Sequence, residues 1–215
     1  MKKRIFITAT NTNIGKTYTT KRLLKAFAAR GLAVGVIKPI ETGVSDGYAP
    51  DGEELLECAK ALNPKLWSLE VEDIVPITYE LPAAPFVASS NTAFDLKSVL
   101  RAIEAMEASC DIVLIEGAGG LYVPIDANTM MIDLIKMLDA KVLLVTHCSL
   151  GCINDTLLSK KALEGLHVEH LVAFNCREND ENFSTVSLPY FEHTKQQVLK
   201  VDDDIDLICE LLYNL

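Results

Sequence analysis

Short apolar segments rich in Val and Ile recur along the chain, with stretches of helical length between them. Strands are predicted at 4–9, 33–39, 111–118, 141–147 and 170–176. These segments are nearly continuous in hydrophobic residues rather than alternating, which is typical of strands covered on both faces. Helices are predicted at 17–30, 52–62, 95–108, 129–139, 152–165 and 202–214. Asp95 and Thr129 are suited to N-caps, and Gly31 and Gly165 to helix ends.

This alternation of strands and helices predicts an α/β fold with a mostly parallel central sheet flanked by helices on both faces. At 215 residues the chain is expected to form one domain, 1–215. Ligands of such sheets bind beyond the carboxyl ends of the strands. Unusual polar residues follow the predicted strands at Thr8 to Thr17, Lys38, Glu116, His147 to Gly151, and Asn175.

Composition and charge narrow the functional classes. A hydrophobic content of 49% with 23% charged residues is ordinary for a soluble globular protein. The net charge of −10 argues against a nucleic-acid surface, which needs clustered Lys and Arg. It leaves an anionic small molecule open, because a few cations in a cleft act locally.

No targeting or membrane segment is expected. The apolar run after Arg4 covers only residues 5–7, whereas a secretory signal needs about 7–15 apolar residues. No stretch approaches the ~20 residues of a membrane span. The chain is therefore predicted to be cytoplasmic.

The six cysteines, at 58, 110, 148, 152, 176 and 209, form no C-x-x-C pair. In a reducing compartment they are expected to be buried free thiols. Cys148 and Cys152 are four residues apart and suit redox partners or soft-metal ligands, but no second pair with ligand spacing accompanies them.

The segment "ITATNTNIGKTYTT", residues 7–20, resembles a phosphate-binding loop in its second half only. Gly15, Lys16 and Thr17 fit the end of G-x-x-x-x-G-K-[ST], but Thr10 occupies the position of the first glycine. Backbone N–H groups and the start of the following helix would bind phosphates, with Lys16 between the β- and γ-phosphates and Thr17 on Mg²⁺. Ala9 is tolerated unless its φ angle must be positive.

Two further strand ends supply matching chemistry. In "DIVLIEGAGGLYVPID", residues 111–126, a buried strand delivers Glu116 beside three glycines, as a second Mg²⁺ ligand near phosphates requires. In "IKPIETG", Lys38 points into the same crevice and Pro39 turns the chain out of the sheet. In "THCSLGCINDTLL", residues 146–158, the N–H groups of a helix starting near Cys152 are suited to a carboxylate, although a simple connection explains them equally well.

Taken together, these stretches resemble the dethiobiotin synthetase family. Its loop is similar to G-T-D-T-x-V-G-K-T, which Ala9 to Thr17 matches at Thr10, Thr12, Gly15, Lys16 and Thr17. "KPIETG", "EGAGGLYVPI" and "LGCIN" resemble K-P-[VI]-x-[ST]-G, E-G-A-G-G-x-x-x-P-[IL] and L-G-[CT]-[IL]-N. The matches span residues 3–176 in the family's order.

The resemblance implies a P-loop enzyme that forms the ureido ring of dethiobiotin from 7,8-diaminononanoate, CO₂ and ATP with Mg²⁺. The substrate amine captures CO₂ as a carbamate, whose oxygen attacks the γ-phosphate, and the second amine closes the resulting carbamic–phosphoric anhydride. Lys16 and Lys38 would offset the charge on the transferring phosphoryl group. Thr12 would orient carbamate and phosphate.

The resemblance also implies the remaining site residues. Mg²⁺ would be held by Thr17, Glu116 and an acid from the 46–54 segment, for which Asp51 is preferred and Asp46 is the alternative. Thr42 would contact the diamine, and a homodimer would bind the substrate carboxylate at Gly151, Cys152, Ile153 and Asn154 of the neighbouring subunit. The implied nucleotide-binding residues are Asn13, Ile14, Gly15, Lys16, Thr17, Tyr18, Asp51, Glu116, Gly117, Ala118, Gly119, Asn175 and Pro189.

The chain departs from the family pattern in two places. Ala84 and Phe86 stand where the family often has S-P-H, and the chain after Asn175 is short before "SLPYF", which contains Pro189. The base preference is therefore left open.

Two other functions are compatible with Gly15 to Thr17. A dimeric switch ATPase of the partitioning or septum-positioning type would need an early lysine in the loop, and positions 9–14 have none. A non-catalytic nucleotide-binding module would have no need of Lys38 and Glu116.

Overall fold

The computed structural model describes residues 3–177, 180 and 182–215. The strands are β1 (Lys3–Ala9), β2 (Val34–Ile37), β3 (Glu41–Thr42), β4 (Thr78–Tyr79), β5 (Ile112–Gly120), β6 (Lys141–His147) and β7 (His170–Asn175). The longer helices are α1 (Lys16–Ala29), α2 (Pro50–Leu62), α5 (Leu96–Glu107), α6 (Met131–Met137), α7 (Cys152–Gly165) and α10 (Ile205–Asn214). The short ones are η1 (Pro64–Leu66), α3 (Val71–Ile74), α4 (Pro85–Ala88), α8 (Phe183–Val186) and α9 (Leu188–His193).

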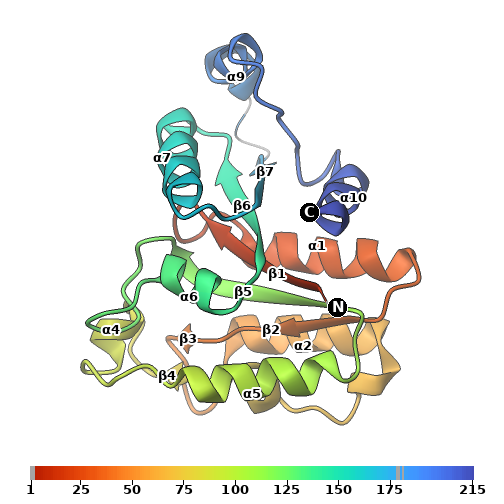
Figure 1. The fold of residues 1–215 in the computed structure, drawn as a ribbon, viewed down its shortest axis with the longest axis vertical. Coiled ribbons are helices and arrows are strands. Elements are labelled where there is room, and N and C mark those ends of the chain that lie inside the picture. The colour runs from red at the N-terminus through yellow and green to blue at the C-terminus, as the bar shows by residue number, and fades with distance from the viewer. Residues whose placement is uncertain (1–2, 178–179, 181) are drawn as a thin grey trace.

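The central sheet has five strands in the order β2-β5-β1-β6-β7, and every neighbouring pair is parallel (Figure 1). β1 lies in the middle because Ile5, Phe6 and Ile7 are apolar on both faces, and each is at most 1% exposed. The predicted mostly parallel sheet is confirmed. Its parallel strands bring the polar residues after β1, β2, β5, β6 and β7 to one edge.

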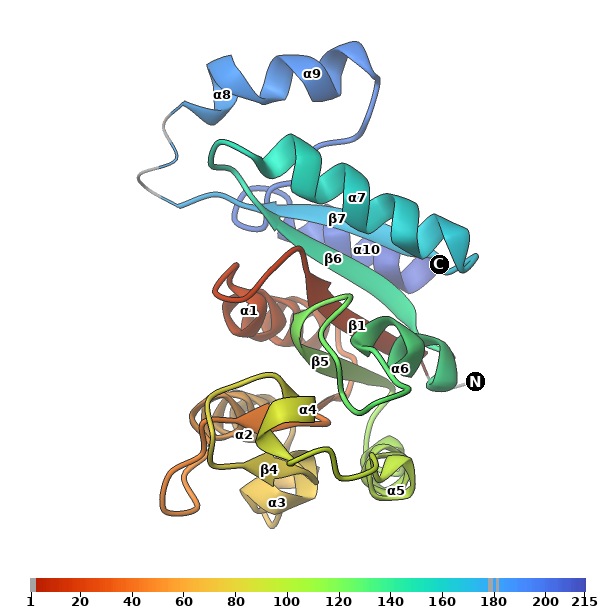
Figure 2. The same ribbon diagram turned by 90° about the vertical axis from the view of Figure 1, so that its left-hand side faces the viewer.

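Helices cover both faces of this sheet, as predicted. α1 packs against both α2 and α10 on one face, while α5, α6 and α7 pack on the other (Figure 2). Asp95 is the N-cap of α5, where its side chain accepts a hydrogen bond from the backbone N–H of Ser98 (3.2 Å). Gly31 follows the end of α1 with a positive φ of 80°, as a helix stop requires.

Several predicted boundaries are wrong. Thr129 is not a cap, because its carbonyl accepts the N–H of Ile125 (2.8 Å) in a turn and Met130 is the N-cap of α6. α10 begins at Ile205 rather than 202. Gly165, which was predicted to end a helix, is the last residue of α7, but the positive φ occurs two residues later, at His167.

A small second core lies under α8 and α9, which no sequence pattern predicted. Phe174, at the end of β7, packs edge-on against Phe191 and tilted against Phe183, with ring centroids 5.1 and 5.4 Å away. Cys148 and Cys152 complete this cluster. α8 and α9 are therefore held beyond the edge of β7 by aromatic packing.

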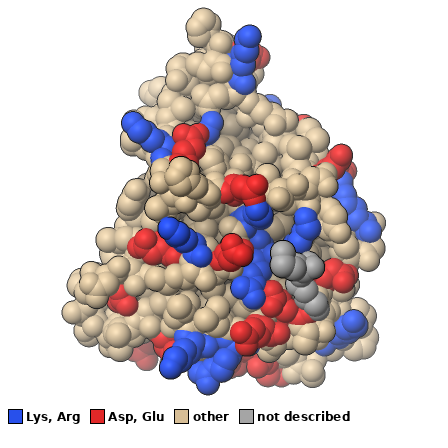
Figure 3. Space-filling model, viewed as in Figure 1, with Lys and Arg blue, Asp and Glu red and all other residues tan. Residues whose placement is uncertain are grey.

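The surface carries both signs of charge. On the face seen in Figure 3, Lys and Arg are interspersed with Asp and Glu. None of the helices in the described part of the chain has the length and apolar character needed to cross a bilayer.

Candidate active site

The loop between β1 and α1 has the conformation of a phosphate-binding loop. Gly15 has a φ of 97°, and a Cβ there would lie 2.1 Å from the Asn175 side-chain nitrogen, so only glycine fits. That same nitrogen donates to the carbonyl of Ile14 (2.8 Å). Ala9 ends the buried strand without a positive φ, which explains how alanine replaces a glycine here.

Lys16 opens α1 and lies at its positive end. It is 8% exposed, and its Nζ contacts only the carbonyl of Asn11 (3.4 Å) among the described residues. Its pKa is lowered to about 8, mainly by burial and also by the charge of Lys38, against the opposing effect of Glu116. A bound phosphate would favour the protonated form.

Lys38 is buried between two carboxylates. Its Nζ is 2.7 Å from Asp51 Oδ2 and 2.9 Å from Glu116 Oε1, and Glu116 is fully buried. Burial disfavours the ammonium, but the charges of Glu116 and Asp51 outweigh it and raise the pKa of Lys38. Lys38 is thus a permanent cation at this edge of the sheet.

The same carboxylates meet the hydroxyl of Thr17. Thr17 Oγ1 donates to Glu116 Oε1 (2.9 Å) and lies 3.3 Å from Asp51 Oδ1. Burial would raise the pKa of Asp51, but the ion pair with Lys38 and the hydrogen bonds from Lys38 and Thr17 keep it lowered. The site therefore presents the hydroxyl oxygen of Thr17 and two carboxyl groups beside Lys38.

Glu41 holds Asp51 in place. Its Oε1 accepts the N–H of Asp51 (2.8 Å) and its Oε2 accepts the N–H of Gly52 (2.9 Å), both in the first turn of α2. Ala49, the N-cap of that helix, has no side-chain cap, so the carboxylate of Glu41 replaces one. Burial raises the pKa of Glu41 despite these hydrogen bonds and the nearby charge of Lys38.

A cavity of about 670 Å³ opens on these groups, and it brings together most of the predicted site. The predicted residues that line it are Thr12, Asn13, Gly15, Lys16, Thr17, Lys38, Thr42, Asp51, Gly117, Ala118 and Gly119. Glu116 accepts hydrogen bonds from two of the lining residues, Thr17 and Lys38. Gly117 has no room for a side chain, since a Cβ there would lie 2.7 Å from the ring of Phe6.

Other predicted residues lie outside the described lining of this cavity. Tyr18 is 44% exposed and donates to Asp202. Pro189 is exposed in α9, and Asp46 is exposed in the turn between Ser45 and Tyr48. Gly151, Cys152, Ile153 and Asn154 form the start of α7 after the neighbouring strand β6.

The cavity also contains three residues that the sequence reasoning missed: Ile40, Glu41 and Arg177. Ile40 and Glu41 are part of the motif "KPIETG", in which the sequence predicts roles only for the flanking Lys38 and Thr42. Arg177 follows Asn175 by two residues. A cation just after a predicted strand is a sequence signal that could have indicated a phosphate contact.

The prediction that all cysteines are free thiols is wrong. Cys148 and Cys176 form a disulfide, with Cα atoms 4.9 Å apart. They directly follow His147 and Asn175, which are paired in the parallel register of β6 and β7. The other four remain thiols, of which Cys152 is buried near this bond and Cys58 is half-buried.

The oxygen set near Lys38 fits a hard divalent cation. Thr17 Oγ1, Asp51 Oδ1 and Glu116 Oε1 converge, and a cationic ammonium is already bound by the two acids. No group of three or more His, Cys, Asp or Glu suited to a metal occurs among the described residues. Mg²⁺ needs no such cage, because it takes one or two carboxylates plus phosphate oxygens and water.

Fold and site together define a P-loop nucleotide-binding protein. A family model described as an AAA domain matches residues 3–211. The ATP-dependent dethiobiotin synthetase BioD of Sulfurovum sp. (strain NBC37-1) is 49% identical over 87% of this chain and 89% of its own. BioD of Helicobacter pylori (strain Shi470) is 38% identical over 87% and 88%, and BioD of Wolinella succinogenes is 34% identical over 98% of both chains. The chain belongs to the ATP-dependent dethiobiotin synthetase family.

Solved structures with a similar fold come from other proteins. A plasmid partition protein from Borrelia burgdorferi superimposes with a TM-score of 0.61 at 11% identity, covering 100% of this chain and 99% of that one. A ParA family ATPase from Chlorobium tepidum gives 0.53 at 13% identity, covering 93% and 84%. Identities this low define the fold alone, so the switch-ATPase alternative has support from the fold only.

Proposed function

We propose that this chain is a ligase that forms dethiobiotin from 7,8-diaminononanoate, CO₂ and ATP. Family membership makes the enzyme a C–N bond-forming ligase of biotin biosynthesis. The observation that carries the proposal is the convergence of Lys16, Lys38, Thr17, Asp51 and Glu116 on one cavity at the start of α1. A triphosphate needs such a set of cations and hard oxygens.

In the proposed reaction, one substrate amine captures CO₂ as a carbamate, and a carbamate oxygen attacks the γ-phosphate. ADP leaves, and the second amine then closes the ring on the carbamic–phosphoric anhydride with release of phosphate. Lys38 and Lys16 counter the charge that develops on the transferring group. Thr12, which lines the cavity from the loop, orients carbamate and phosphate.

The nucleotide is proposed to lie along the loop Asn13 to Thr17 with its phosphates at the positive end of α1. Gly117, Ala118 and Gly119 border the phosphates from β5. Tyr18, Asn175 and Pro189 complete the proposed nucleotide-binding residues. Asn175 supports the loop by donating to the carbonyl of Ile14 (2.8 Å), and Pro189 lies on α9.

Thr17, Asp51 and Glu116 are the proposed ligands of Mg²⁺. The ion, when bound with ATP, supplies positive charge to the β- and γ-phosphate oxygens. Asp51 is preferred over Asp46 because its carboxylate contacts both Thr17 and Lys38. Glu41 fixes this carboxylate through the backbone of α2.

Thr42 is the proposed contact of the diamine, and a homodimer is proposed to complete its site. Gly151 to Asn154 would bind the substrate carboxylate of the neighbouring subunit with the N–H groups at the start of α7. Leu150, just before this turn, is 85% exposed and Leu158 on α7 is 62% exposed, which suits a surface covered by a second copy. Location in the cytoplasm stays a prediction from the sequence.

The test is to incubate the protein with Mg-ATP, bicarbonate and 7,8-diaminononanoate and to measure phosphate and the ring product. We expect phosphate release that depends on the diamine, with ring product in equal amount. Phosphate release that ignores the diamine would instead favour a switch ATPase. Nucleotide binding without any phosphate release would favour a non-catalytic module.

A further inference from the structure

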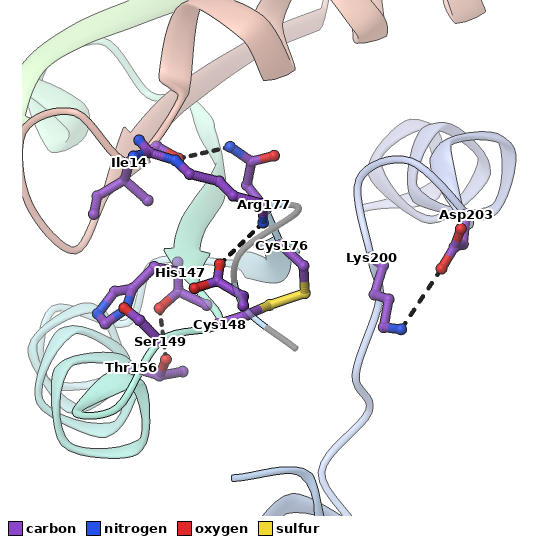
Figure 4. Close-up of a disulfide and its surroundings, with 12 residues drawn as sticks. Ile14, His147, Cys148, Ser149, Thr156, Cys176, Arg177, Lys200 and Asp203 are labelled. Carbon is purple, nitrogen blue, oxygen red and sulfur yellow. Dashed lines mark hydrogen bonds and ion pairs between the residues drawn. A yellow bond between two sulfur atoms is a disulfide. The ribbon is translucent and has the colours of Figure 1, made fainter. Parts of the chain in front are cut away.

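Arg177 is a third cation of the phosphate cavity. It lines this cavity together with Lys16 and Lys38, and its guanidinium donates to the carbonyl of Asn13 in the loop. Figure 4 shows the side chain reaching from the end of β7 across to the loop at Ile14. The exposed Arg177 thus contacts the backbone of the loop that would surround the phosphates.

The charges of the cavity leave a role for this residue. Lys38 is paired with both Asp51 and Glu116, so its charge is already balanced by carboxylates. Among the described residues, no carboxylate lies within ion-pair distance of the guanidinium of Arg177. A triphosphate carries about four negative charges, of which one Mg²⁺ balances two, so further cations are needed. The planar guanidinium has five N–H donors and suits phosphate oxygens.

The disulfide fixes the backbone from which Arg177 extends. Cys176 directly precedes Arg177 and is bonded to Cys148 at the end of the neighbouring strand (Figure 4). On the other side of the bond, Cys148 is 2% exposed and packs in the aromatic cluster of Phe174, Phe183 and Phe191. Cys176 is therefore tied to a packed part of the molecule at the point where the chain leaves the sheet.

We infer that Arg177 binds a phosphate of the nucleotide and that the Cys148–Cys176 disulfide positions it. This inference rests on the proposed function in taking a nucleoside triphosphate as the ligand. A dithiol reductant would break the bond in two steps. Its thiolate attacks one sulfur, forms a mixed disulfide and releases the other cysteine as a thiolate. The second thiolate of the reductant then attacks the reductant's own sulfur in the mixed disulfide, which frees the second cysteine and leaves the reductant oxidised and cyclic. Arg177 would then lose its fixed position.

The test is a binding titration of the full chain, without diamine, using Mg-ATP and inorganic tripolyphosphate as separate probes. Arg177→Ala should raise the Kd for both probes about tenfold, the expected loss of a hydrogen-bonded charge contact, and Arg177→Lys should recover part of it. Arg101→Ala, an exposed arginine on α5, is the matched control and should bind like the wild type. An Arg177→Ala chain that binds like this control would overturn the inference. Weaker binding of ATP alone, with tripolyphosphate unchanged, would overturn the phosphate assignment.

The positioning role is tested by asking whether the effect of reducing the disulfide depends on the presence of Arg177. Reduction with dithiothreitol should raise the wild-type Kd about threefold, the scale of ordering one long side chain, and should leave Arg177→Ala unchanged. The Cys148→Ser/Cys176→Ser chain should match the reduced wild type, while Cys58→Ser should respond to reduction like the wild type. Equal weakening of wild type and Arg177→Ala on reduction, or none in the wild type, would overturn this role. Normal nucleotide binding without ring product would sink the proposed function and leave the role of Arg177 standing.

Discussion

The edge of the sheet at which the strands end has two halves of different character. The phosphate half, after β1, β2 and β5, contains Lys16, Thr17, Lys38, Asp51 and Glu116. There, the buried Lys38 and Glu116 are bound to each other, and Lys38 is also bound to the half-buried Asp51. The thiol half, after β6 and β7, contains residues 147–154 and 175–177, and a disulfide and an aromatic cluster hold it together. The first half has the chemistry to bind phosphates and Mg²⁺, and the second positions Arg177 at the same cavity and carries an exposed surface.

The two halves are stabilised by different interactions, and this difference has functional consequences. In the phosphate half, removing one charged group leaves its buried partner without compensation. In the thiol half, the exposed Leu150 precedes α7, and the first turn of that helix contributes backbone N–H groups and Asp155, which lies 3.1 Å from the His147 ring. Changes in the first half should therefore affect chemistry, whereas changes in the second should affect the binding of nucleotide and substrate, and assembly.

The largest effect is expected from the two lysines. Lys16→Ala and Lys38→Ala should each lower kcat by at least about 10²-fold, because each removes a positive charge from the transferring phosphoryl group. Lys25→Ala, an exposed lysine on α1, is the matched control and should be near wild type in steady-state phosphate release. Near-normal turnover in Lys38→Ala would remove Lys38 from the catalytic residues.

A smaller effect separates the two candidate metal acids. Asp51→Asn should raise the Mg²⁺ concentration needed for half-maximal rate about tenfold or more, since it removes one anionic ligand of the ion. Asp46→Asn, in an exposed turn, should leave that concentration unchanged. A Mg²⁺ titration that ranks these variants in the opposite order would transfer the role to Asp46.

Leu150→Asp tests the thiol half. If a second copy covers this surface, a buried charge there should weaken the dimer and raise the KM for the diamine about tenfold, while nucleotide binding stays normal. Sedimentation velocity and steady-state kinetics measure the two effects on one sample. An unchanged dimer with an unchanged KM would contradict the proposed site between subunits.

The smallest effect is expected from Glu41→Gln, which keeps the shape but removes the charge at the start of α2. It should cost about 0.5–1 kcal/mol of unfolding free energy, the scale of a helix-terminus charge, and should raise the Mg²⁺ requirement less than Asp51→Asn does. Denaturant unfolding and the Mg²⁺ titration report both quantities. An effect on Mg²⁺ larger than that of Asp51→Asn would mean that Glu41 contacts the ion itself.

The phosphate half could be predicted because its signals are local. Gly15, Lys16 and Thr17 adjoin in sequence, Lys38 directly follows β2, and Glu116 lies within the apolar strand β5, so the parallel sheet alone brings them to one edge. The order of the strands was not needed for that step. The five strands of the central sheet and the six longer helices were predicted with boundaries within a few residues of those observed.

The thiol half could not be predicted because its contacts depend on register. Cys148 and Cys176 are 28 residues apart, and only the pairing of His147 with Asn175 brings them together. The same register places Arg177 beside the loop, while α8 and α9 depend on contacts between Phe174, Phe183 and Phe191. Glu41 was missed for a similar reason, since its partners belong to the backbone of another element.

The most direct test is a crystal structure of the chain soaked with a non-hydrolysable ATP analogue and Mg²⁺. The triphosphate is expected along Asn13 to Thr17, with Lys16 and Lys38 on its terminal phosphate and the ion bound by Thr17, Asp51 and Glu116. A triphosphate bound elsewhere, or Lys38 still paired only with Asp51 and Glu116 and turned away from the phosphates, would contradict this account.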